Sequence, residues 1–415
     1  MIGGLMKKIS LIAIAAAAAA AFATNASAAD LGGDCCADLE ERIAELEATT
    51  ARKGNRKVSL TVSGWVNEAV MFWDDGVESN IYQVTNVVAQ TRFRFVGQAK
   101  IDDEWSAGYL IEIGIRGAGS DQVNANIDDG TSPNSLAIRH SAWWLNSKRL
   151  GKVWVGQTSA ATDGIMEINV ANVGHFATQN AGAQVGGFTV RGTGLTLRNF
   201  MGGGSNTAAQ IGEGERHNVV KYETPTIQGF TLSAAYGEDD LWDVALRYAG
   251  EFNGVKMAFG VGYSQWTEGA SQGGTNEYNC ADIFPAAPDV SCQQFGVSGA
   301  IMHVPTGLYV HAAYGVRTDD NVLLNDEMSQ FYVQGGIERK FFPLGKTTMF
   351  VEYQNWDNER RNTELNMWGL GLNQNIEAAA MDLYIRYNNF DADDNNLATN
   401  EESFQSVIMG GKINF

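Results

Sequence analysis

The sequence contains little of several residue types that would indicate a catalytic or disulfide-rich protein. It has only four cysteines, five histidines and six prolines in 415 residues. Four cysteines are too few for a disulfide scaffold in a chain of this length. No metal-ligand spacing and no G-x-S-x-G nucleophile motif is present; the histidines lie at His140, His175, His217, His303 and His311. We therefore predict neither an enzyme nor a bound metal or other cofactor.

Long apolar runs and positive charge are also scarce. Beyond the N-terminal segment no stretch of 18 apolar residues occurs, so no membrane-spanning helix is predicted. The 29 basic residues face 48 acidic ones, which gives a net charge of −19 and argues against nucleic acid as a partner. What the chain does contain is glycine, with 47 residues, and a 10% share of aromatic residues.

The N-terminus has the organisation of a secretory signal peptide. Lys7 and Lys8 precede an apolar run from Leu11 to Ala23, and small residues follow up to Ala28. This order of a positive region, a short apolar region and an A-x-A-like site is typical of a cleaved export signal. We expect residues 1–28 to be removed, so the mature chain is exported.

Residues 29–56 are predicted to form a periplasmic segment with a short helix. Leu39, Ile43 and Leu46 repeat at heptad-like spacing, and Asp38 with Glu41 fits a capping box. A helix of this length is marginal alone, so its apolar stripe needs a partner. Three copies of the helix could form a bundle, or the helix could lie against the mouth of the β-barrel predicted below; a disordered leader is the alternative.

From residue 57 onward, apolar and polar residues alternate in runs of about ten, the pattern of transmembrane β-strands. Met381, Leu383, Ile385 and Tyr387, for example, share one face. The pattern predicts an all-β fold, a 16-stranded antiparallel barrel over 57–415. The expected strands are 57–72, 89–101, 105–117, 136–146, 151–158, 216–224, 229–237, 240–251, 255–266, 293–303, 308–317, 329–340, 347–356, 365–376, 381–391 and 403–415.

The connections support a barrel in the outer membrane. Those after even-numbered strands are short and several carry Pro or Gly, as in Val304–Gly307. Those after odd-numbered strands are usually longer, as expected for external loops. The longest, 159–215, follows the fifth strand. Its stretch Gly187–Arg191 could add a hairpin, so eighteen strands is the alternative count.

The period-2 pattern also predicts which side chains face the lumen. Phe93 and Phe95 are expected to face outward, and so are Ala142 and Trp144. Charges that face lipid are costly, so charged residues of the strands are placed inside. The predicted inward basic residues are Arg92, Arg94, Arg116, Arg139, Lys152, Lys221, Arg247 and Arg386. Asp163 and Glu167 of the long connection are expected to oppose them. The simpler interpretation is that all these residues merely solvate a lumen.

Two sets of residues at the strand ends point to the membrane surfaces. Aromatic residues near strand ends suit interfacial girdles; they are Trp73, Trp105, Tyr248, Tyr263, Trp266, Tyr353 and Trp356. The external loops are rich in acidic residues, among them Asp74, Asp75 and Asp319. These could hold divalent cations that bridge lipopolysaccharide phosphates, or they are simply solvated.

Two of the cysteines are spaced to close a loop. Cys280 and Cys292 lie in one external connection, where a disulfide would contribute about 3 kcal/mol in the chain-entropy model. The adjacent Cys35 and Cys36 could pair between subunits or stay free.

Several stretches resemble the alphaproteobacterial general porins. They are ADLEERIAELEATTARKGNRKVSLTVSGWVN (37–67), SKRLGKVWVGQTSAATDGI (147–165), HNVVKYETPTIQGFTLSAAYGEDD (217–240) and the ending GGKINF. The resemblance covers essentially the whole mature chain. It implies a homotrimer of sixteen-stranded diffusion pores in the outer membrane, with the third loop folded inward to narrow each channel. It further implies that Phe415 is a signal read by barrel-assembly machinery, and that Ala29 could be joined to peptidoglycan.

The expected function is therefore a water-filled channel for small hydrophilic solutes and ions. Its acidic mouth predicts a preference for cations. Two alternatives are a structural tether or adhesion barrel, and a sugar-selective channel. The second would need an aromatic stripe along the lumen, whereas the predicted inward aromatics Trp65, Trp143 and Tyr384 are scattered.

Overall fold

The computed structural model describes residues 57–129, 136–202, 211–237, 240–268, 290–319, 327–397 and 403–415. The predicted signal peptide, the N-terminal helix, Ala29, Cys35, Cys36 and Cys280 lie outside these ranges. No helix among the described residues is both long and apolar enough to cross a membrane.

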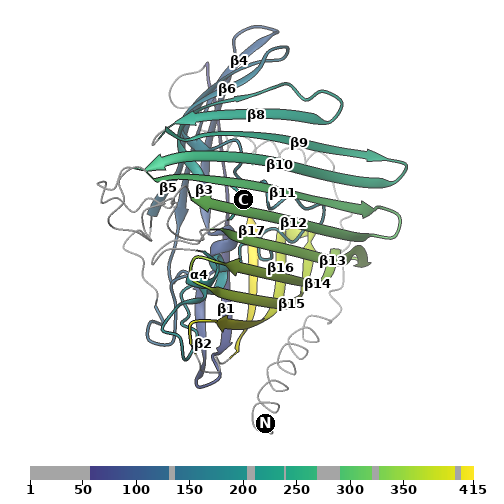
Figure 1. The fold of residues 1–415 in the computed structure, drawn as a ribbon. Coiled ribbons are helices and arrows are strands. Elements are labelled where there is room, and N and C mark those ends of the chain that lie inside the picture. Colours follow the sequence, from purple (N-terminus) through teal and green to yellow (C-terminus); the bar gives the residue numbers. More distant parts are fainter. Residues whose placement is uncertain are drawn as a thin grey trace.

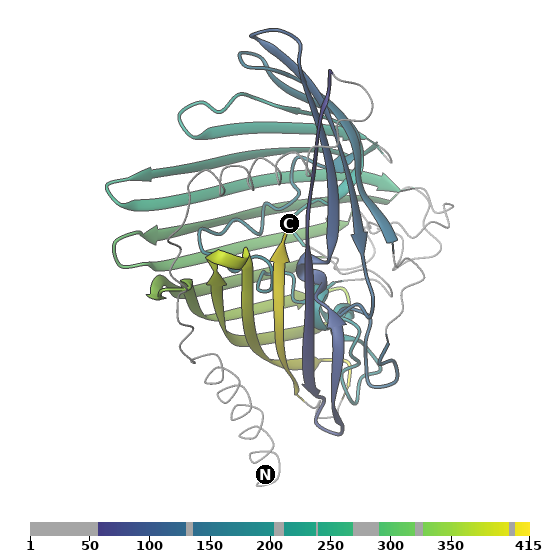
Figure 2. The ribbon, with the colours of Figure 1, turned by 180° about the vertical axis from the view of Figure 1, so that it is seen from behind.

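The described chain is an antiparallel β-barrel (Figures 1 and 2). Its strands are β1 (Ser59–Asp74), β2 (Ser79–Thr85), β3 (Arg92–Lys100), β4 (Trp105–Ile115), β5 (Leu136–Ser147), β6 (Gly151–Ser159), β7 (Arg216–Glu223), β8 (Phe230–Gly237), β9 (Trp242–Phe252), β10 (Val255–Glu268), β11 (Val290–His303), β12 (Leu308–Asp319), β13 (Met328–Phe342), β14 (Gly345–Asn358), β15 (Thr363–Ile376), β16 (Met381–Asp394) and β17 (Phe404–Asn414). The barrel is closed because Trp65–Asp74 of β1 pairs with Gln405–Asn414 of β17. Closure leaves no unpaired edge, which a membrane requires.

These strands form a sixteen-stranded barrel, as predicted, because β2 and β3 lie end to end along one neighbour. β2 pairs with Glu68–Asp74 and β3 with Ser59–Trp65, both on β1. The predicted second strand, 89–101, missed the first of these two pieces, Ser79–Thr85. The sequence signal was weak there because Ser79, Asn80 and Gln83 are polar.

A short 3-10 helix, η1 (Val87–Ala89), interrupts this second barrel strand. Side chains of β1 satisfy the backbone at the break: Trp65 Nε1 and Asn67 Nδ2 both donate to the Ala89 carbonyl, at 3.1 and 3.0 Å. Another 3-10 helix, η3 (Glu377–Ala379), connects β15 and β16. At η1, therefore, the Ala89 carbonyl that the strand interruption leaves without a ladder partner is hydrogen-bonded by side chains, and the backbone there is not frayed.

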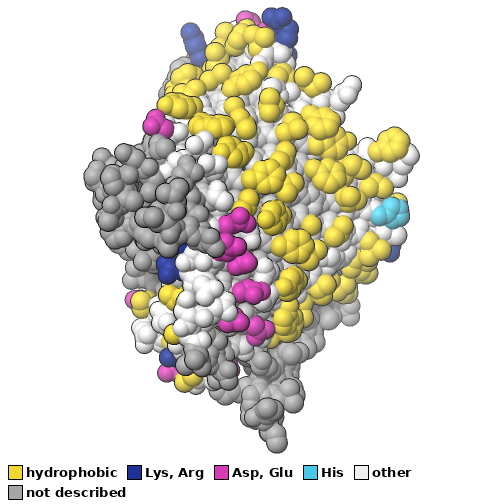
Figure 3. All heavy atoms as spheres, in the orientation of Figure 1, with side chains coloured by type: hydrophobic (Ala, Val, Ile, Leu, Met, Phe, Trp, Pro, Cys, Tyr) yellow, Lys and Arg dark blue, Asp and Glu magenta, His cyan; other side chains and the backbone are white. Residues whose placement is uncertain are grey.

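The outer face of the strands carries an apolar band. Figure 3 shows hydrophobic side chains covering the face formed by β8–β15, with acidic side chains gathered along one margin. Leu246, Phe259, Val297, Val310 and Val351 are all exposed on this face. Exposed residues of this type, in alternation with buried polar ones, are what lipid contact requires.

A β-bulge reverses one set of predicted side-chain directions. Glu112 is opposite His140, but the next residue, Ile113, is opposite Ile138, so Arg139 is the extra residue. The prediction that Ala142 and Trp144 face outward is therefore wrong: both are 7% exposed, whereas Trp143 is 53% exposed. A bulge adds one residue and flips every side chain beyond it to the other face.

Loop 3, residues 160–215 between β6 and β7, folds into the barrel. Its described part contains two short helices, α3 (Gly182–Val185) and α4 (Leu197–Phe200), and no strand, so the eighteen-strand alternative is wrong. Val185, Phe188, Leu197 and Phe200 pack in one buried cluster with residues of β1, β2 and β13–β17. Loop 3 thus supplies a hydrophobic core inside the barrel.

Three of the aromatic residues assigned to the membrane interfaces belong to the interior instead. Trp73, Trp266 and Trp356 are only 2–3% exposed. Trp73 contacts Phe188 of loop 3, with 5.1 Å between the ring centroids. Sequence position near a strand end did not distinguish a girdle residue from one that packs on an inward loop. Tyr353, by contrast, is exposed as predicted.

Candidate functional site

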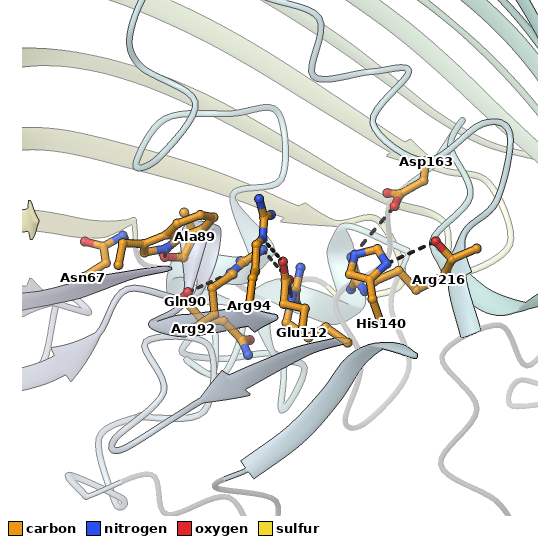
Figure 4. Close-up of polar contacts among 12 residues, drawn as sticks. Asn67, Ala89, Gln90, Arg92, Arg94, Glu112, His140, Asp163 and Arg216 are labelled. Atoms are coloured by element: carbon orange, nitrogen blue, oxygen red, sulfur yellow. Dashed lines mark hydrogen bonds and ion pairs between the residues drawn. The ribbon is translucent and has the colours of Figure 1, made fainter. Parts of the chain in front are cut away.

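Three arginines converge on one buried carboxylate on the inner wall (Figure 4). Arg92 Nη1 lies 3.0 Å and Arg139 Nε 2.7 Å from Glu112 Oε1, and Arg94 Nε is paired with Oε2. The Glu112 side chain is 0% exposed, whereas that of Arg94 is 38% exposed. One negative charge is thus shared by three positive ones, and the wall keeps a net positive charge that Arg94 presents to the lumen.

Strand register explains how these residues meet. Arg94 is directly opposite Glu112, and Arg92 is two residues away on the same face of β3. Arg139 reaches the same carboxylate because it is the bulge residue of β5. Parity correctly placed Arg92 and Arg94 inside. Arg139 also lies inside, but it does so as the bulge residue, since the predicted parity of Ala142 and Trp144 on the same strand is reversed. Glu112 was not predicted as an inward residue, although it alternates with the apolar residues Ile111 and Ile113.

An indole ring extends this basic surface toward β17. Trp65 has the guanidinium carbons of Arg92 and Arg94 at 4.5 and 5.0 Å from its ring centroid, and Lys412 Nζ at 4.8 Å. Contacts of this kind stabilise cations over an aromatic face. The inner wall from β17 to β5 is consequently lined by a continuous group of cations.

Loop 3 brings acidic groups into the interior of the barrel. Asp163 Oδ2 lies 4.0 Å from Arg216 Nη1, and the Asp163 carbonyl accepts a 2.7 Å hydrogen bond from Arg247 Nη2. Glu167 is exposed to the lumen. Arg247 also donates to the Ala161 carbonyl at 2.7 Å, so it holds the loop to the wall.

A second inward group lies on β5–β7. Lys152 Nζ lies 3.7 Å from the ring centroid of Trp154 and 4.4 Å from that of Trp144. Lys221 Nζ pairs with Glu223 at 3.1 Å. Both lysines face inward as predicted, but each is already engaged by neighbouring wall residues.

Besides Arg247, two further predicted lumen arginines anchor loops. Arg116 lies 3.6 Å from Asp121, which also contacts Arg198 of loop 3 at 3.7 Å. Arg386 faces inward, but its side chain is 0% exposed and is paired with Glu352 beneath loop 3. The prediction that Arg386 lines the open lumen is therefore wrong, because the loop covers it.

The sequence matches one family model, described as Gram-negative porin, over residues 13–405. The chain belongs to the Gram-negative porin family. This porin is accordingly an outer-membrane channel for the passive diffusion of small solutes. No curated protein is similar enough to the sequence to count as a match.

Solved structures share the fold of this porin at low sequence identity. The anion-selective porin from Comamonas acidovorans is 14% identical with a TM-score of 0.58, covering 86% of this chain and 100% of its own. OmpF of Salmonella typhi, in complex with daunomycin, is 14% identical with a TM-score of 0.54, covering 87% and 99%. OmpT of Vibrio cholerae in its trimer form is 13% identical with a TM-score of 0.54, covering 86% and 99%.

One acidic residue that the sequence analysis missed lies inside loop 3 of the porin. Glu213 is 1% exposed; its carboxylate accepts hydrogen bonds from Met166 N at 2.8 Å and Gln179 Nε2 at 3.0 Å. Burial, together with the nearby Glu167 and Asp163, raises the pKa of Glu213 well above its ordinary value. No periodic signal marks such a loop residue in the sequence.

Within the described ranges, no group of three or more His, Cys, Asp or Glu residues could hold a metal ion in this porin. Cys292 is disulfide-bonded. Its predicted partner, Cys280, lies outside the described residues, so that pairing stays a prediction.

Proposed function

We propose that solutes pass this porin through a constriction between the arginine cluster and loop 3. The observation that carries the proposal is the sharing of Glu112 by Arg92, Arg94 and Arg139. Asp163 of loop 3 provides negative charge on the other side, and Glu167 adds to it in part, because desolvation inside the barrel and the nearby Asp163 raise the pKa of Glu167 to about 7. A positive wall opposite a negative loop produces a transverse field, which orients dipolar solutes and influences ion preference.

A channel for sugars fits these residues less well. The inward aromatics that could stack on a sugar are already covered: Trp65 by three cations and Tyr384, at 3% exposure, by Phe176 and its own hydrogen bonds. The side chains that remain available in the lumen are mainly charged. We therefore propose small polar and charged solutes as the substrate class. We propose no enzymatic activity.

Single-channel recording in a planar bilayer tests the constriction. Arg94→Gln combined with Arg139→Gln should alter conductance and weaken discrimination between anionic and cationic solutes of equal size. The matched control is Arg149→Gln, whose side chain is 79% exposed in a turn away from the cluster. If the double variant and the control conduct alike while both fold, the arginine cluster does not form the constriction.

We propose that three copies assemble. The resemblance to trimeric porins and the trimer form of Vibrio cholerae OmpT support this assembly. Phe415 is proposed as the signal for barrel-assembly machinery; it pairs with Gly64 through two backbone hydrogen bonds of 3.0 Å, and its side chain is exposed. Attachment of Ala29 to peptidoglycan remains a proposal outside the described residues.

A cross-strand row of carboxylates supports contact with lipopolysaccharide. Asp357, Glu364 and Asp393 are neighbours on β14, β15 and β16, and all three are exposed on the outer face. Like charges placed directly opposite repel each other, so this row attracts cations. We propose that it concentrates divalent cations near lipopolysaccharide phosphates through its field, without a coordination site.

A further inference from the structure

The second barrel strand contains four more residues than its neighbour β1 can pair with. Thr85 is opposite Glu68, and Arg92 is opposite Trp65. Between these two pairs β1 has two residues, whereas the second strand has six, residues 86–91. The chain therefore leaves the ladder for four inserted residues and then returns to it. We refer to residues 86–91, which include η1, as the insertion segment.

An even number of inserted residues keeps both parts of the strand facing the same way. Tyr82 and Val84 of β2 are 7% and 0% exposed, and Arg92 of β3 is 8% exposed on the same inner side. Side chains alternate with a period of two, so an odd number of additional residues would have turned Arg92 and Arg94 toward lipid. Removal of residues 87–90 would therefore give an unbroken strand with the same inward and outward side chains. The wall does not need these four residues.

The first part of the insertion segment contacts loop 3. Val87 N donates to Ser120 Oγ at 3.1 Å, and Ser120 Oγ donates to the Ala183 carbonyl of α3 at 2.9 Å. Ser120 is 0% exposed, so this bridge is shielded from solvent. The helix η1 itself lies beside α3. The residues that the wall does not need thus support loop 3.

The last part of the insertion segment holds two of the lumen arginines. The Gln90 carbonyl accepts a hydrogen bond from Arg92 Nε at 3.0 Å, and Gln90 Oε1 accepts one from Arg116 Nε at 2.7 Å. Arg92 is also paired with Glu112 in the arginine cluster. Figure 4 shows Ala89 and Gln90 together with the residues of this cluster. One short segment is therefore bonded to both sides of the proposed constriction.

The Asn67 side chain joins the insertion segment to loop 3 a second time. It is 0% exposed, and its Nδ2 donates to the Ala89 carbonyl at 3.0 Å and to the His175 carbonyl of loop 3 at 3.2 Å. Its Oδ1 accepts a 2.7 Å hydrogen bond from the Tyr384 hydroxyl, which accepts one of 2.9 Å from Asn86 Nδ2. A side-chain amide has two N–H donors and one acceptor oxygen. Here both donors and the oxygen have partners, so the orientation of the amide is determined.

We propose that the insertion segment is a spacer that fixes the separation of the arginine cluster and loop 3, with Asn67 as its positioning residue. Additional residues in a strand are found beside functional sites, where they redirect side chains. In this chain the four additional residues leave the directions of the wall unchanged and bond to both sides of the passage. This inference rests on the proposed constriction, because a spacer affects permeation only if the two sides that it separates bound the passage.

Deletion of residues 87–90 from the full-length porin tests the spacer. The variant should still form a barrel, seen as a change of migration between heated and unheated gels, because the parity of the wall is kept. Its single-channel conductance should rise and protease should cleave loop 3 faster, since the contacts at Val87 and Ala89 are lost. A folded variant with unaltered conductance would overturn the proposal. A variant that forms no barrel would also contradict it, because the wall would then depend on the insertion segment.

Substitutions of Asn67 test its positioning role without changing the length of the strand. Asn67→Asp keeps the shape but places an oxygen against the carbonyls of Ala89 and His175, so conductance should rise at least as much as in Asn67→Leu. Tyr384→Phe removes one hydrogen bond to Asn67 and should give a smaller rise. Tyr387→Phe is the matched control, because this buried tyrosine of the same strand donates to a side chain of β17 instead. Equal conductance in the Asn67 variants and the control would show that Asn67 does not position the loop.

Combining the two changes tests whether Asn67 acts through the insertion segment. Asn67→Leu should raise conductance in the unaltered porin and have little further effect in the deletion variant, because its partner Ala89 is then absent. Residues that act through one another give such non-additive effects. Fully additive rises in conductance would show that Asn67 acts independently of the segment, against the proposal.

The arginine variant described above separates this inference from the proposed constriction. If Arg94→Gln with Arg139→Gln alters conductance and the deletion of residues 87–90 does not, the spacer is overturned and the constriction stands. If the deletion alters conductance and the arginine variant does not, the cluster does not bound the passage. The segment would then only support loop 3, and both proposals would fail. Altered conductance in both variants is the expected result.

Discussion

Arg386 of β16 and Glu352 of β14 form an ion pair with 2.7 Å between Nε and Oε1, and neither side chain is exposed to solvent. Loop 3 lies on top of this pair. Arg386 Nη1 donates to the Phe176 carbonyl at 3.3 Å and to Gln184 Oε1 at 3.1 Å. Tyr332 donates to the other oxygen of Glu352 at 2.7 Å. The pair therefore links the barrel wall to the loop.

Breaking this pair should release loop 3. Arg386→Met leaves the Glu352 carboxylate buried without compensation, which costs about 3–5 kcal/mol. We expect lower thermal stability, faster proteolysis of loop 3 and higher conductance. Lys340→Met is the control, since its pair with Glu377 is about half exposed and should contribute only about 0–1 kcal/mol. Conductance unchanged from the unaltered porin would show that this anchor does not position the loop.

Replacing both charges tests whether the penalty comes from the uncompensated charge. Arg386→Met combined with Glu352→Leu removes two buried charges and should recover part of the lost stability, because an apolar pair can replace a buried ion pair. Differential scanning calorimetry of the two variants measures how much of the lost thermal stability is recovered. A double variant as unstable as the single one would indicate that lost hydrogen bonds to loop 3 dominate.

The strand pattern predicted the barrel well because each lipid-facing position needs an apolar residue, whatever its partner. It predicted that Arg92 and Arg94 face the lumen for the same reason, since a charge that faces lipid is costly. The bulge at Arg139 could not be predicted, since it depends on pairing with β4 and leaves no mark in local alternation. Arg386 could not be recognised as an anchor, because its burial is caused by residues about two hundred positions away.

Two glycines on the inner wall make room for the returning part of loop 3. A Cβ at Gly296 would overlap the Gly212 carbonyl, and one at Gly315 would meet the backbone of Ile211 and Gly212. Gly296→Val should therefore displace this part of the loop at a cost of about 1–3 kcal/mol and change conductance. Gly335→Ala is the control, because its added carbon would meet only the Tyr309 carbonyl, at an ordinary contact distance of 4.0 Å. Normal conductance in Gly296→Val would show that the loop can shift without affecting the passage.

Acid should loosen loop 3 at His175. Burial lowers the pKa of this side chain to about 4, although Asp382 acts in the opposite direction and Lys412 adds to the lowering. Because the folded pKa lies below the unfolded value of about 6.5, the contribution to stability is present above pH 6.5 and lost as pH falls through 4. Proteolysis of loop 3 and conductance, measured between pH 7 and pH 3.5, should both change.

His175→Phe isolates this effect. The imidazole already contacts Phe176 and Tyr384, with ring centroids 4.9 and 5.5 Å apart, so an aromatic ring without a charge fits the same surroundings. This variant should lose the acid-induced change, whereas His303→Gln in an exposed turn should keep it. An identical acid response in His175→Phe would assign the response to other groups.

The ion preference of the pore should change when positive charge is removed from its inner wall. The excess of acidic residues predicts a cation-preferring pore. Arg94→Gln combined with Lys412→Gln removes two positive charges beside Trp65. The zero-current potential under a salt gradient should therefore move toward the value of a pore that conducts only cations. An anion preference of the unaltered porin would contradict the prediction from the sequence. An unmoved potential in the variant would show that the wall does not determine selectivity.

Loop 3 was predicted as an inward loop only through the family resemblance, and its internal structure was not predicted. The sequence between 160 and 215 lacks the alternation of strands, and in its described part the helices α3 and α4 have four residues each. Its conformation is determined by long-range partners: Asn169 donates to Gln334 and Asn172 to Asp382. Single-sequence patterns report local order, so contacts of this range lie beyond them.

The position of loop 3 inside a closed barrel constrains the order of assembly. Its partners Gln334, Asp382 and Asn388 belong to strands that emerge from synthesis long after the loop itself. Bringing such distant segments together is slow, because chain entropy is lost before any contact compensates for it. A finished barrel would have to admit the whole loop through its mouth. We therefore expect the loop to settle on β10–β16 while β1 and β17 are still apart, so that the pairing of these two strands encloses it.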